Sequence, residues 1–308
     1  MSTEKTDILI IGGGPAGLTA GVYAARSGKR TIILEEKICG GQIINTEIIH
    51  NMPGFVEVTG AELGLNLTEQ AEKAGAEIVY DEVQTITLTD DNKTLTTAGG
   101  VTFEAKAVII ATGAGPRKLG AKNEKSFDGR GIHYCALCDG AFYKDKDVVV
   151  VGGGNSAVEE VIYLSPIAKS IAIINITKDF VAQAPSIEEL KNLPNVKAIH
   201  HEHEVVEIMG KDNLTGIKIK NVNNNQSCQL ECDAVFVSIG RAPNVELFKD
   251  IVELSKGGYI KVNSQKMTNI HGVFAAGDVT EKQIRQLVTA CNDGAIAASF
   301  AGMCCKEN

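Results

Sequence analysis

The sequence lacks a long hydrophobic run. A membrane-spanning helix needs about 18 or more consecutive apolar residues, and no stretch of that kind occurs. The first residues, Met1–Lys5, are polar and do not resemble a signal peptide. We therefore expect a cytoplasmic protein without a membrane partner.

Positive charge is also scarce. The chain has 30 Lys and Arg against 38 Asp and Glu, which gives a net charge of −8. Because nucleic-acid-binding proteins carry clustered positive charge, this balance argues against nucleic acid as a partner. Hydrophobic residues make up 44% and charged residues 22% of the 308 positions, which is typical of one or two globular domains with a substantial core.

Two of the eight cysteines form a pair that needs its own explanation. Cys135 and Cys138 are separated by two residues and can close a small disulfide ring, and Asp139 follows as a proton acceptor. The pair could instead be half of a zinc site, but Cys228 and Cys232, which could supply the missing ligands, lie on another predicted hairpin. Asp139 could instead cap a helix. We expect a redox disulfide and no metal.

A glycine-rich turn joins the first predicted strand to the first predicted helix. Residues 6–11 are an apolar run of strand length, Gly12–Gly17 reads G-x-G-x-x-G, and a helical pattern follows. The first glycine permits a tight turn, the second lets the backbone approach a pyrophosphate, and the third lets the helix pack closely. Glu35 ends the next strand about 20 positions on, where an acidic residue would bind a ribose. This context predicts a dinucleotide site.

A second unit of the same kind begins later in the chain. Residues 147–151 form a buried type of strand, Gly152–Ala157 repeats the fingerprint with Ala in the third place, and a helix and the strand 171–174 follow. This loop could hold a second pyrophosphate, or its glycines could serve packing alone. Both possibilities stay open at this point.

The rest of the chain completes the first unit. We predict a helix at 61–74, short strands over 76–110, a strand at 273–278 and an Ala-rich helix at 283–301. The polar stretch Arg117–Arg130 is expected to be a linker. The fold class is then α/β, with two Rossmann-like dinucleotide-binding domains of three layers (ββα), the second inserted in the first. The expected domains are 1–114 with 245–308, and 115–244.

These motifs together resemble the low-molecular-weight thioredoxin reductases, flavoproteins with two dinucleotide folds. The resemblance covers nearly the full length of the chain. The matching segments are Gly12–Gly17, Gly41-Gln42, Asn51–Phe55, Ala111–Gly113, Cys135–Gly140, Gly240–Asn244, Gly277-Asp278 and Arg285-Gln286.

The resemblance implies an FAD enzyme that reduces thioredoxin or a similar protein disulfide and forms a homodimer. It implies that Cys138 lies nearer the flavin, that Cys135 attacks the partner disulfide, and that Asp139 donates and accepts the proton. Glu35 would hold the adenosine ribose and Asp278 the ribityl or pyrophosphate region. The expected cofactor-binding residues are Gly12, Gly14, Pro15, Ala16, Gly17, Glu35, Glu36, Gly41, Gln42, Asn51, Ala111, Thr112, Gly113, Gly277, Asp278, Arg285 and Gln286.

The second unit departs from the family pattern. NADPH-using members carry His-Arg-Arg and a further Arg after the second strand, which grip the 2′-phosphate. The corresponding positions here are Asn175, Ile176, Thr177 and Val181. None is cationic, so a charge-assisted fork to a phosphate is lost. Lys178 nearby would be a single mobile charge, and the strand-end acid that favours NADH is also missing.

The electron donor is therefore expected to be reduced ferredoxin, as in a subgroup of the family that lacks the NADPH motif. Flavin can take electrons one at a time from such a donor. Ferredoxins are acidic, so docking needs a local basic patch, for which the candidates are Arg117, Lys118, Lys122, Lys125 and Arg130. One alternative is NADPH or NADH bound at a divergent site. An alternative of another class is a flavin and disulfide redox sensor without turnover.

Overall fold

The computed structural model describes residues 3–46 and 48–305. Met1 and Ser2 of the polar start, and the last three residues of the expected first domain, lie outside the described residues. The chain divides into two compact units. Unit 1 comprises the described parts of Met1–Gly115 and Ala242–Asn308, and unit 2 is Pro116–Arg241. Two short strands, β7 (Ala114–Pro116) and β16 (Arg241–Pro243), pair where the chain passes between the units.

Unit 1 is built on a mostly parallel sheet. The strand order is β3-β2-β1-β6-β5-β4, and β17 also pairs with β6. The strands β4, β5 and β6 pair antiparallel, whereas β1, β2 and β3 are parallel and are joined by helical crossovers. The strands are β1 (Thr3–Ile11), β2 (Thr31–Glu35), β3 (Glu77–Tyr80), β4 (Val83–Leu88), β5 (Lys93–Thr97), β6 (Thr102–Ile110) and β17 (Val273–Ala275).

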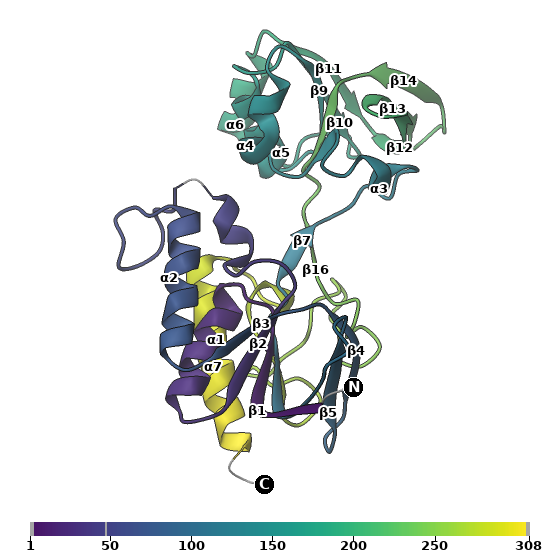
Figure 1. Cartoon of the computed structure of the whole chain (residues 1–308). Helices are drawn as coiled ribbons and strands as arrows, with labels where there is room; N and C mark the ends of the chain where they lie inside the picture. The colour runs from purple at the N-terminus through teal and green to yellow at the C-terminus, as the bar shows by residue number, and fades with distance from the viewer. Residues whose placement is uncertain (1–2, 47, 306–308) are drawn as a thin grey trace. The chain divides into compact units, whose positions relative to one another are not determined.

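Both faces of this sheet are covered. The helices α1 (Pro15–Arg26), α2 (Gly60–Lys73) and α7 (Leu287–Cys304) lie together on one face (Figure 1). Along β1, Ile8 and Ile10 pack against these helices, whereas Leu9 and Ile11 pack against the hairpin side. Alternate side chains of a strand point to opposite faces, which explains why the strand reads as an unbroken apolar run. Two 3₁₀ helices, η1 (Gly41–Asn45) and η3 (Gly277–Val279), lie in loops.

Unit 2 repeats the plan with three layers. A parallel sheet has the order β11-β10-β9-β15-β8, and β12-β13-β14 form a separate antiparallel sheet. Val148 and Val150 of β9 pack with the helix side, while Val149 and Val151 pack with residues of the antiparallel sheet. The helices are α3 (Glu124–Phe127), α4 (Ala136–Asp139), η2 (Gly140–Tyr143), α5 (Asn155–Leu164) and α6 (Ala184–Lys191).

The strands of unit 2 are β8 (Ile132–His133), β9 (Asp147–Val151), β10 (Ser170–Asn175), β11 (Val196–His201), β12 (His203–Gly210), β13 (Leu214–Asn221), β14 (Ser227–Glu231) and β15 (Ala234–Val237). The predicted fold class, α/β with two Rossmann-like units, is confirmed.

The stretch Arg117–Arg130 is not a linker, so that prediction is wrong. It belongs to unit 2, and Phe127 is buried in the core at 3% exposure. Glu124 is also buried. Its carboxylate accepts hydrogen bonds from the Gly120 N–H and the Tyr134 hydroxyl, each at 2.8 Å. The polar composition of this stretch serves an internal hydrogen-bond network, which composition alone does not distinguish from a solvated linker.

The last helix differs from the predicted range 283–301. Helix α7 begins at Leu287 because Gln286 and Thr289 form a capping box there. Among the described helices, only α7 has the length and mean hydropathy, 1.2, of a membrane span. It packs along α1 and carries the buried carboxylate of Asp293, as expected for a core helix of a globular unit.

Candidate functional site

The redox pair lies at the start of helix α4 in unit 2. Cys135 and Cys138 form a disulfide with a Cα–Cα distance of 5.4 Å. Strand β8 ends two residues before Cys135 and Ala136 begins the helix, so one turn of helix brings the two sulfurs together. Cys138 is exposed and Cys135 is half-buried. The pair is therefore accessible to another molecule from the side of Cys138.

Asp139 is held by a histidine rather than acting as a helix cap. As the N-cap residue of η2, its side chain makes no capping hydrogen bond, so the capping alternative is not supported. Its Oδ2 lies 3.0 Å from Nδ1 of His133, and Nε2 of His133 lies 2.7 Å from the Tyr143 hydroxyl. The sequence analysis missed both His133 and Tyr143. His133 precedes Cys135 by two positions on a strand, which was the available signal.

A buried carboxyl lies beneath the same helix. Glu160 of α5 accepts a hydrogen bond from the Ala136 backbone N–H, between the two cysteines. Burial raises the pKa of Glu160 to about 7. Its Oε2 is buried and has no hydrogen-bond partner among the described residues. The side chain is thus protonatable near neutral pH and touches the backbone of the redox segment.

The remaining cysteines are separate from this pair. Cys228 is exposed on β14 and Cys232 is buried. Burial raises the pKa of Cys232 to about 12, so its thiol stays protonated at neutral pH. Among the residues that the structure describes, no group of three or more His, Cys, Asp or Glu could hold a metal ion.

The first glycine loop has the geometry of a dinucleotide cradle. Gly12 has φ +106°, and a Cβ there would lie 2.5 Å from the Ala111 carbonyl oxygen. A Cβ on Gly17 would lie 1.8 Å from the Gly12 oxygen, so only glycine lets α1 approach this closely. A Cβ on Gly14 would meet nothing nearer than 3.9 Å. The space beside Gly14 and the N-terminus of α1 fits a pyrophosphate.

Glu35 lies beside this cradle, as the sequence predicts. Its Oε2 accepts a hydrogen bond from the Gly13 N–H at 2.7 Å, and Oε1 accepts one from the Lys37 N–H at 3.0 Å. The carboxylate is thus fixed at the end of β2, next to the glycine loop. Glu36 instead faces solvent and pairs with the Lys37 ammonium at 3.2 Å. The structure does not bring Glu36 to the loop.

Other expected residues are tied to one another across unit 1. The Asn51 amide donates to Gln286 Oε1 at 3.1 Å, and the Gln42 amide donates to the Ala114 carbonyl. The Thr112 hydroxyl donates to the Asn244 carbonyl at 2.7 Å. Segments far apart in the sequence are therefore joined near the carboxyl ends of the parallel strands, where α/β sheets bind ligands.

The C-terminal part of the predicted site rests on a buried ion cluster that the sequence analysis missed. The Gly277 N–H donates to Asp293 Oδ2 at 3.2 Å, and the Lys266 ammonium lies 2.6 Å from Asp293 Oδ1. The Lys282 ammonium also pairs with this carboxylate. Asp293 is 3% exposed. A single acid in an Ala-rich helix was the sequence signal.

The remaining predicted residues surround the same edge. Arg285 lies 3.8 Å over the Tyr259 ring, and its Nε is buried without a hydrogen-bond partner among the described residues. A buried donor of this kind is what a polar ligand would satisfy. The others are Pro15 and Ala16 at the start of α1, Gly41 in η1, Ala111 and Gly113 just after β6, and Asp278 in η3.

An asparagine side chain packs against the second glycine loop. Asn175 is 2% exposed at the end of β10, and a Cβ on Gly153 would lie 2.2 Å from its Oδ1. Its amide donates to the Asp179 carbonyl at 3.1 Å, and its Oδ1 accepts the Thr177 hydroxyl at 2.9 Å. The side chain therefore organises its own loop and fills the space beside Gly153.

The segment after β10 also lies along this glycine loop. The Val181 N–H donates to the Gly153 carbonyl at 2.7 Å, and the Gln183 N–H donates to Asn155 Oδ1 at 2.8 Å. Ile176 is 59% and Val181 is 74% exposed. Apolar side chains thus face solvent at two of the positions where a nucleotide 2′-phosphate would need cations.

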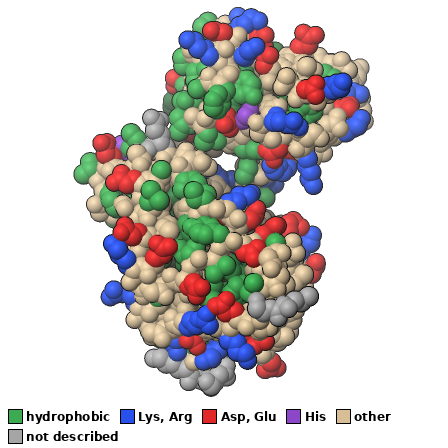
Figure 2. Space-filling model, viewed as in Figure 1, with side chains coloured by type: hydrophobic (Ala, Val, Ile, Leu, Met, Phe, Trp, Pro, Cys, Tyr) green, Lys and Arg blue, Asp and Glu red, His purple; other side chains and the backbone are tan. Residues whose placement is uncertain are grey.

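Two of the five basic residues in the expected docking stretch form ion pairs. Figure 2 shows Lys and Arg interspersed with Asp and Glu on the visible face of unit 2. The Lys118 ammonium lies 2.7 Å from Asp128, and the Lys122 ammonium lies 2.9 Å from Glu207. An acidic protein would meet partly neutralised lysines here.

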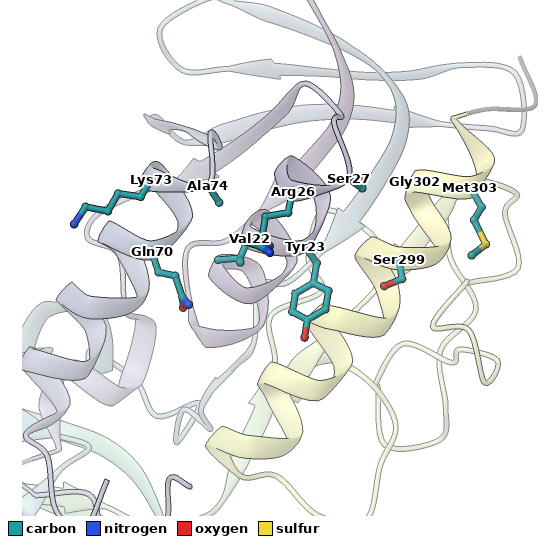
Figure 3. Close-up of a pocket in the computed structure, with 10 residues that line it drawn as sticks. All are labelled: Val22, Tyr23, Arg26, Ser27, Gln70, Lys73, Ala74, Ser299, Gly302 and Met303. Atoms are coloured by element: carbon teal, nitrogen blue, oxygen red, sulfur yellow. The ribbon is translucent and has the colours of Figure 1, made fainter. Parts of the chain in front are cut away.

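A pocket of about 820 Å³ lies elsewhere, over α1, α2 and α7 (Figure 3). Its walls come from the C-terminal ends of α1 and α2, whereas the glycine loop is at the N-terminus of α1. Since α1 has 12 residues, the two ends are about 18 Å apart. The pocket is not part of the cofactor cradle. Its lining residues are Val22, Tyr23, Arg26, Ser27, Gln70, Lys73, Ala74, Ser299, Gly302 and Met303.

Known proteins resemble the chain over nearly its whole length. Residues 6–294 match the family described as pyridine nucleotide-disulphide oxidoreductase. The chain is 46% identical to a 34.2 kDa protein in the rubredoxin operon of Clostridium pasteurianum, covering 98% of both chains. It is 36% identical to the solved thioredoxin reductase of Lactococcus lactis, with a TM-score of 0.84 and 98% and 100% coverage.

A further solved structure is a ferredoxin-flavin thioredoxin reductase from Clostridium acetobutylicum. It is 32% identical, with a TM-score of 0.56 and coverage of 99% of this chain and 100% of the other. Together with the glycine-loop cradle and the disulfide, these findings identify the family of the chain. It belongs to the pyridine nucleotide-disulphide oxidoreductases, in their low-molecular-weight thioredoxin reductase class, as a flavin-dependent disulfide oxidoreductase whose cofactor is FAD.

Proposed function

We propose that the chain reduces thioredoxin or a similar protein disulfide through Cys135 and Cys138, with electrons from reduced ferredoxin. The observation that carries the first part is the accessible disulfide at the start of α4. The observation that carries the second is a second glycine loop whose phosphate-gripping positions are uncharged. The proposal includes a cytoplasmic location, expected from the sequence, and a homodimer, which the family resemblance implies.

The exchange passes one electron pair through the two sulfurs of Cys135 and Cys138 to the disulfide of the partner. FAD, when bound, supplies the two electrons that open the Cys135–Cys138 bond and can collect them singly from a one-electron donor. The Cys135 thiolate then attacks the partner, forming a mixed disulfide and releasing one partner thiolate. The Cys138 thiolate attacks Cys135, re-forms the internal disulfide and releases the second partner thiolate. Asp139 handles the protons that the thiols gain and lose.

The proposed FAD site is the cradle of unit 1. The loop Gly12–Gly17 would receive the pyrophosphate at the N-terminus of α1, and Glu35 would accept hydrogen bonds from the adenosine ribose. Among the residues farther along the chain, Asp278 would act at the ribityl or pyrophosphate region, and Asn51 and Gln286 would line the flavin. The buried Arg285 Nε is a donor that such a ligand could satisfy.

Ferredoxin as donor is supported by two facts. Asn175 is committed to its own loop and occupies the place of the ribose-binding acid, and a relative of this length is described as a ferredoxin-flavin thioredoxin reductase. The alternative donor, NADPH or NADH, is favoured by the preserved glycine loop at 152–157. Because Lys118 and Lys122 are already paired, ferredoxin docking would have to break or bypass these ion pairs.

An anaerobic titration of the flavin absorbance tests the donor. Reduced ferredoxin, NADPH and NADH are added separately to the oxidised holoenzyme, and an excess of oxidised thioredoxin follows. We expect bleaching by ferredoxin and none by stoichiometric nicotinamide, because the 2′-phosphate of NADPH finds no guanidinium fork and the strand-end acid that favours NADH is missing. Bleaching by stoichiometric NADPH or NADH would overturn the ferredoxin proposal. Bleached flavin that thioredoxin does not reoxidise would instead favour the redox-sensor alternative.

Replacing two exposed apolar residues should install nicotinamide use. In Ile176→Arg/Val181→Arg, two guanidinium groups offer bidentate contacts to a phosphate, and both positions are solvent-exposed. We expect the affinity for NADPH to rise about tenfold or more, since charge-assisted hydrogen bonds contribute about 1.5–3 kcal/mol each. The measurement is NADPH binding by calorimetry.

The matched control is Ile176→Gln/Val181→Gln, which adds polarity without charge. NADH, which lacks the 2′-phosphate, should gain nothing from either variant. Equal gains for NADH and NADPH would show that the arginines do not contact that phosphate.

A further inference from the structure

The side chain of Asp139 is oriented by a buried histidine that the proposed exchange chemistry does not itself require. His133 is 7% exposed at the end of β8. Its Nδ1 lies 3.0 Å from Asp139 Oδ2, and its ring packs on Phe236 with the centroids 5.5 Å apart. Because Phe236 is fully buried in the inner strand β15, the imidazole has a rigid support.

The other ring nitrogen of His133 is also occupied. Nε2 lies 2.7 Å from the hydroxyl of Tyr143, and the Tyr143 ring meets Phe236 edge-on at 5.8 Å. Burial, with smaller contributions from the Asp139 and Asp233 carboxylates, raises the pKa of Tyr143. The hydroxyl therefore remains protonated and can donate to Nε2.

This arrangement selects one tautomer of neutral histidine. If the Tyr143 O–H donates to Nε2, the ring proton is on Nδ1, where it donates to the ionised Asp139 carboxylate. Each of the three groups then has its hydrogen bond satisfied. When Asp139 is protonated, the roles reverse: its O–H donates to Nδ1, and Nε2–H donates to the tyrosine oxygen. The array accepts both charge states of Asp139 without moving a side chain.

We propose that His133 is a positioning residue for the thiol–disulfide exchange: it fixes the Asp139 carboxyl beside the redox pair, and Tyr143 fixes the histidine tautomer. The inference rests on the proposed function, in which Asp139 handles the thiol protons. Asp139 is itself anchored at its backbone, where its N–H donates to the Cys135 carbonyl at 3.2 Å. With both backbone and side chain held, the carboxyl keeps one orientation while the disulfide opens and closes.

Other ionisable groups face the same region and must be separated from His133. Glu160 lies beneath Ala136 from α5 and titrates near neutral pH, since burial raises its pKa to about 7. Asp233, in the segment before β15, helps to raise the pKa of Tyr143 through its negative charge. A Glu160→Gln variant therefore accompanies the histidine variants, so that a pH effect of Glu160 is not assigned to His133.

The test is a double-mutant cycle on the FAD-loaded enzyme. We expect His133→Ala to lower thioredoxin reduction about tenfold, because an unoriented carboxyl loses part of the rate enhancement of about 10²–10⁴-fold that general acid–base catalysis supplies. In an Asp139→Asn background, the same change should have no further effect, since residues that act as a unit are not additive. His133→Asn should recover part of the rate, because its amide N–H can replace Nδ1–H.

The second readout is alkylation of the reduced cysteines. Iodoacetamide labelling of Cys135 and Cys138 is followed by mass spectrometry from pH 5 to 9, a range of roughly two units on either side of neutral that spans the titration of histidine. His133→Ala should shift the labelling profile toward that of Asp139→Asn. His203→Ala, which removes another half-buried histidine of unit 2, should not.

Two outcomes would overturn the inference. One is a His133→Ala enzyme that melts at a lower temperature but keeps the wild-type labelling profile, which indicates a structural role only. The other is a double variant, His133→Ala with Asp139→Asn, whose loss of rate equals the product of the two single-variant losses. The proposed function fails separately: if wild-type enzyme reduces no thioredoxin with any donor, that proposal is wrong, while the labelling profiles still decide the role of His133.

Discussion

Replacing Cys138 by serine should abolish the reduction of thioredoxin while the flavin stays bound and reducible. A serine hydroxyl cannot form a disulfide with Cys135. The variant therefore has no internal disulfide to which the flavin can pass its electron pair. The substitution is nearly isosteric and Cys138 is exposed, so the fold should be kept. We expect turnover to fall by about 10³-fold or more, the range seen when a nucleophilic unit is broken. Flavin content, anaerobic bleaching and turnover are measured together.

The same variant tests which cysteine attacks the partner. If Cys135 is the attacking thiol, Cys138→Ser should trap a mixed disulfide with thioredoxin, because the resolving sulfur is gone. Cys135→Ser should trap none. The matched control is Cys228→Ser, which removes an exposed thiol of unit 2 outside the pair and should behave as wild type. Full turnover in Cys138→Ser would show that the assigned electron route is wrong.

Removing the carboxylate of Asp293 should produce the largest loss of stability. Lys266 and Lys282 are mostly buried, with side chains 19% and 12% exposed, and both pair with Asp293. Asp293→Ala leaves two buried ammonium groups without a counter-charge and the Gly277 N–H without its acceptor. Breaking one side of a buried ion pair costs about 3–5 kcal/mol. The free energy of unfolding is measured by urea denaturation of the FAD-free protein.

Two comparisons make the Asp293 result specific. Asp293→Asn keeps an acceptor for Gly277 and removes only the charge, so its loss should be smaller. Glu246→Ala breaks the exposed ion pair with Lys249, 2.9 Å long, and should leave stability unchanged, as exposed pairs contribute little. A loss for Asp293→Ala no larger than that of Glu246→Ala would mean that the lysines are solvated rather than held by this carboxylate.

Much of the fold follows from local sequence patterns. The unbroken apolar runs at β1 and β9 predict strands buried on both faces, and the glycines at 12–17 require the strand–turn–helix geometry that the structure has. Glu35 could be placed because a parallel strand always ends at the same edge as its neighbour. These inferences depend only on contacts between elements that are adjacent in the chain or paired by topology.

The features that the sequence does not reveal are tertiary pairings of polar groups. The composition of Arg117–Arg130 indicates a linker. The stretch is folded because Glu124 accepts a hydrogen bond from Tyr134, which lies outside it. His133 and Tyr143 meet only after β8 and η2 pack around Phe236. Asp293 forms an ion pair with Lys266, which lies 27 positions earlier in the sequence. Composition and periodicity carry no information about such partners.

The second glycine loop is required by the backbone whether or not it binds a nucleotide. Gly152 has φ +148°, and a Cβ there would lie 2.2 Å from the Ser238 carbonyl oxygen, so the position demands glycine whether or not a nucleotide binds. The helix that follows carries Glu160 under the redox segment. The fingerprint therefore also supports the packing of the redox segment, a duty that is independent of nucleotide binding. Ile176 and Val181 beyond β10 are solvent-exposed, so charge can be added or removed at these positions without disturbing the core.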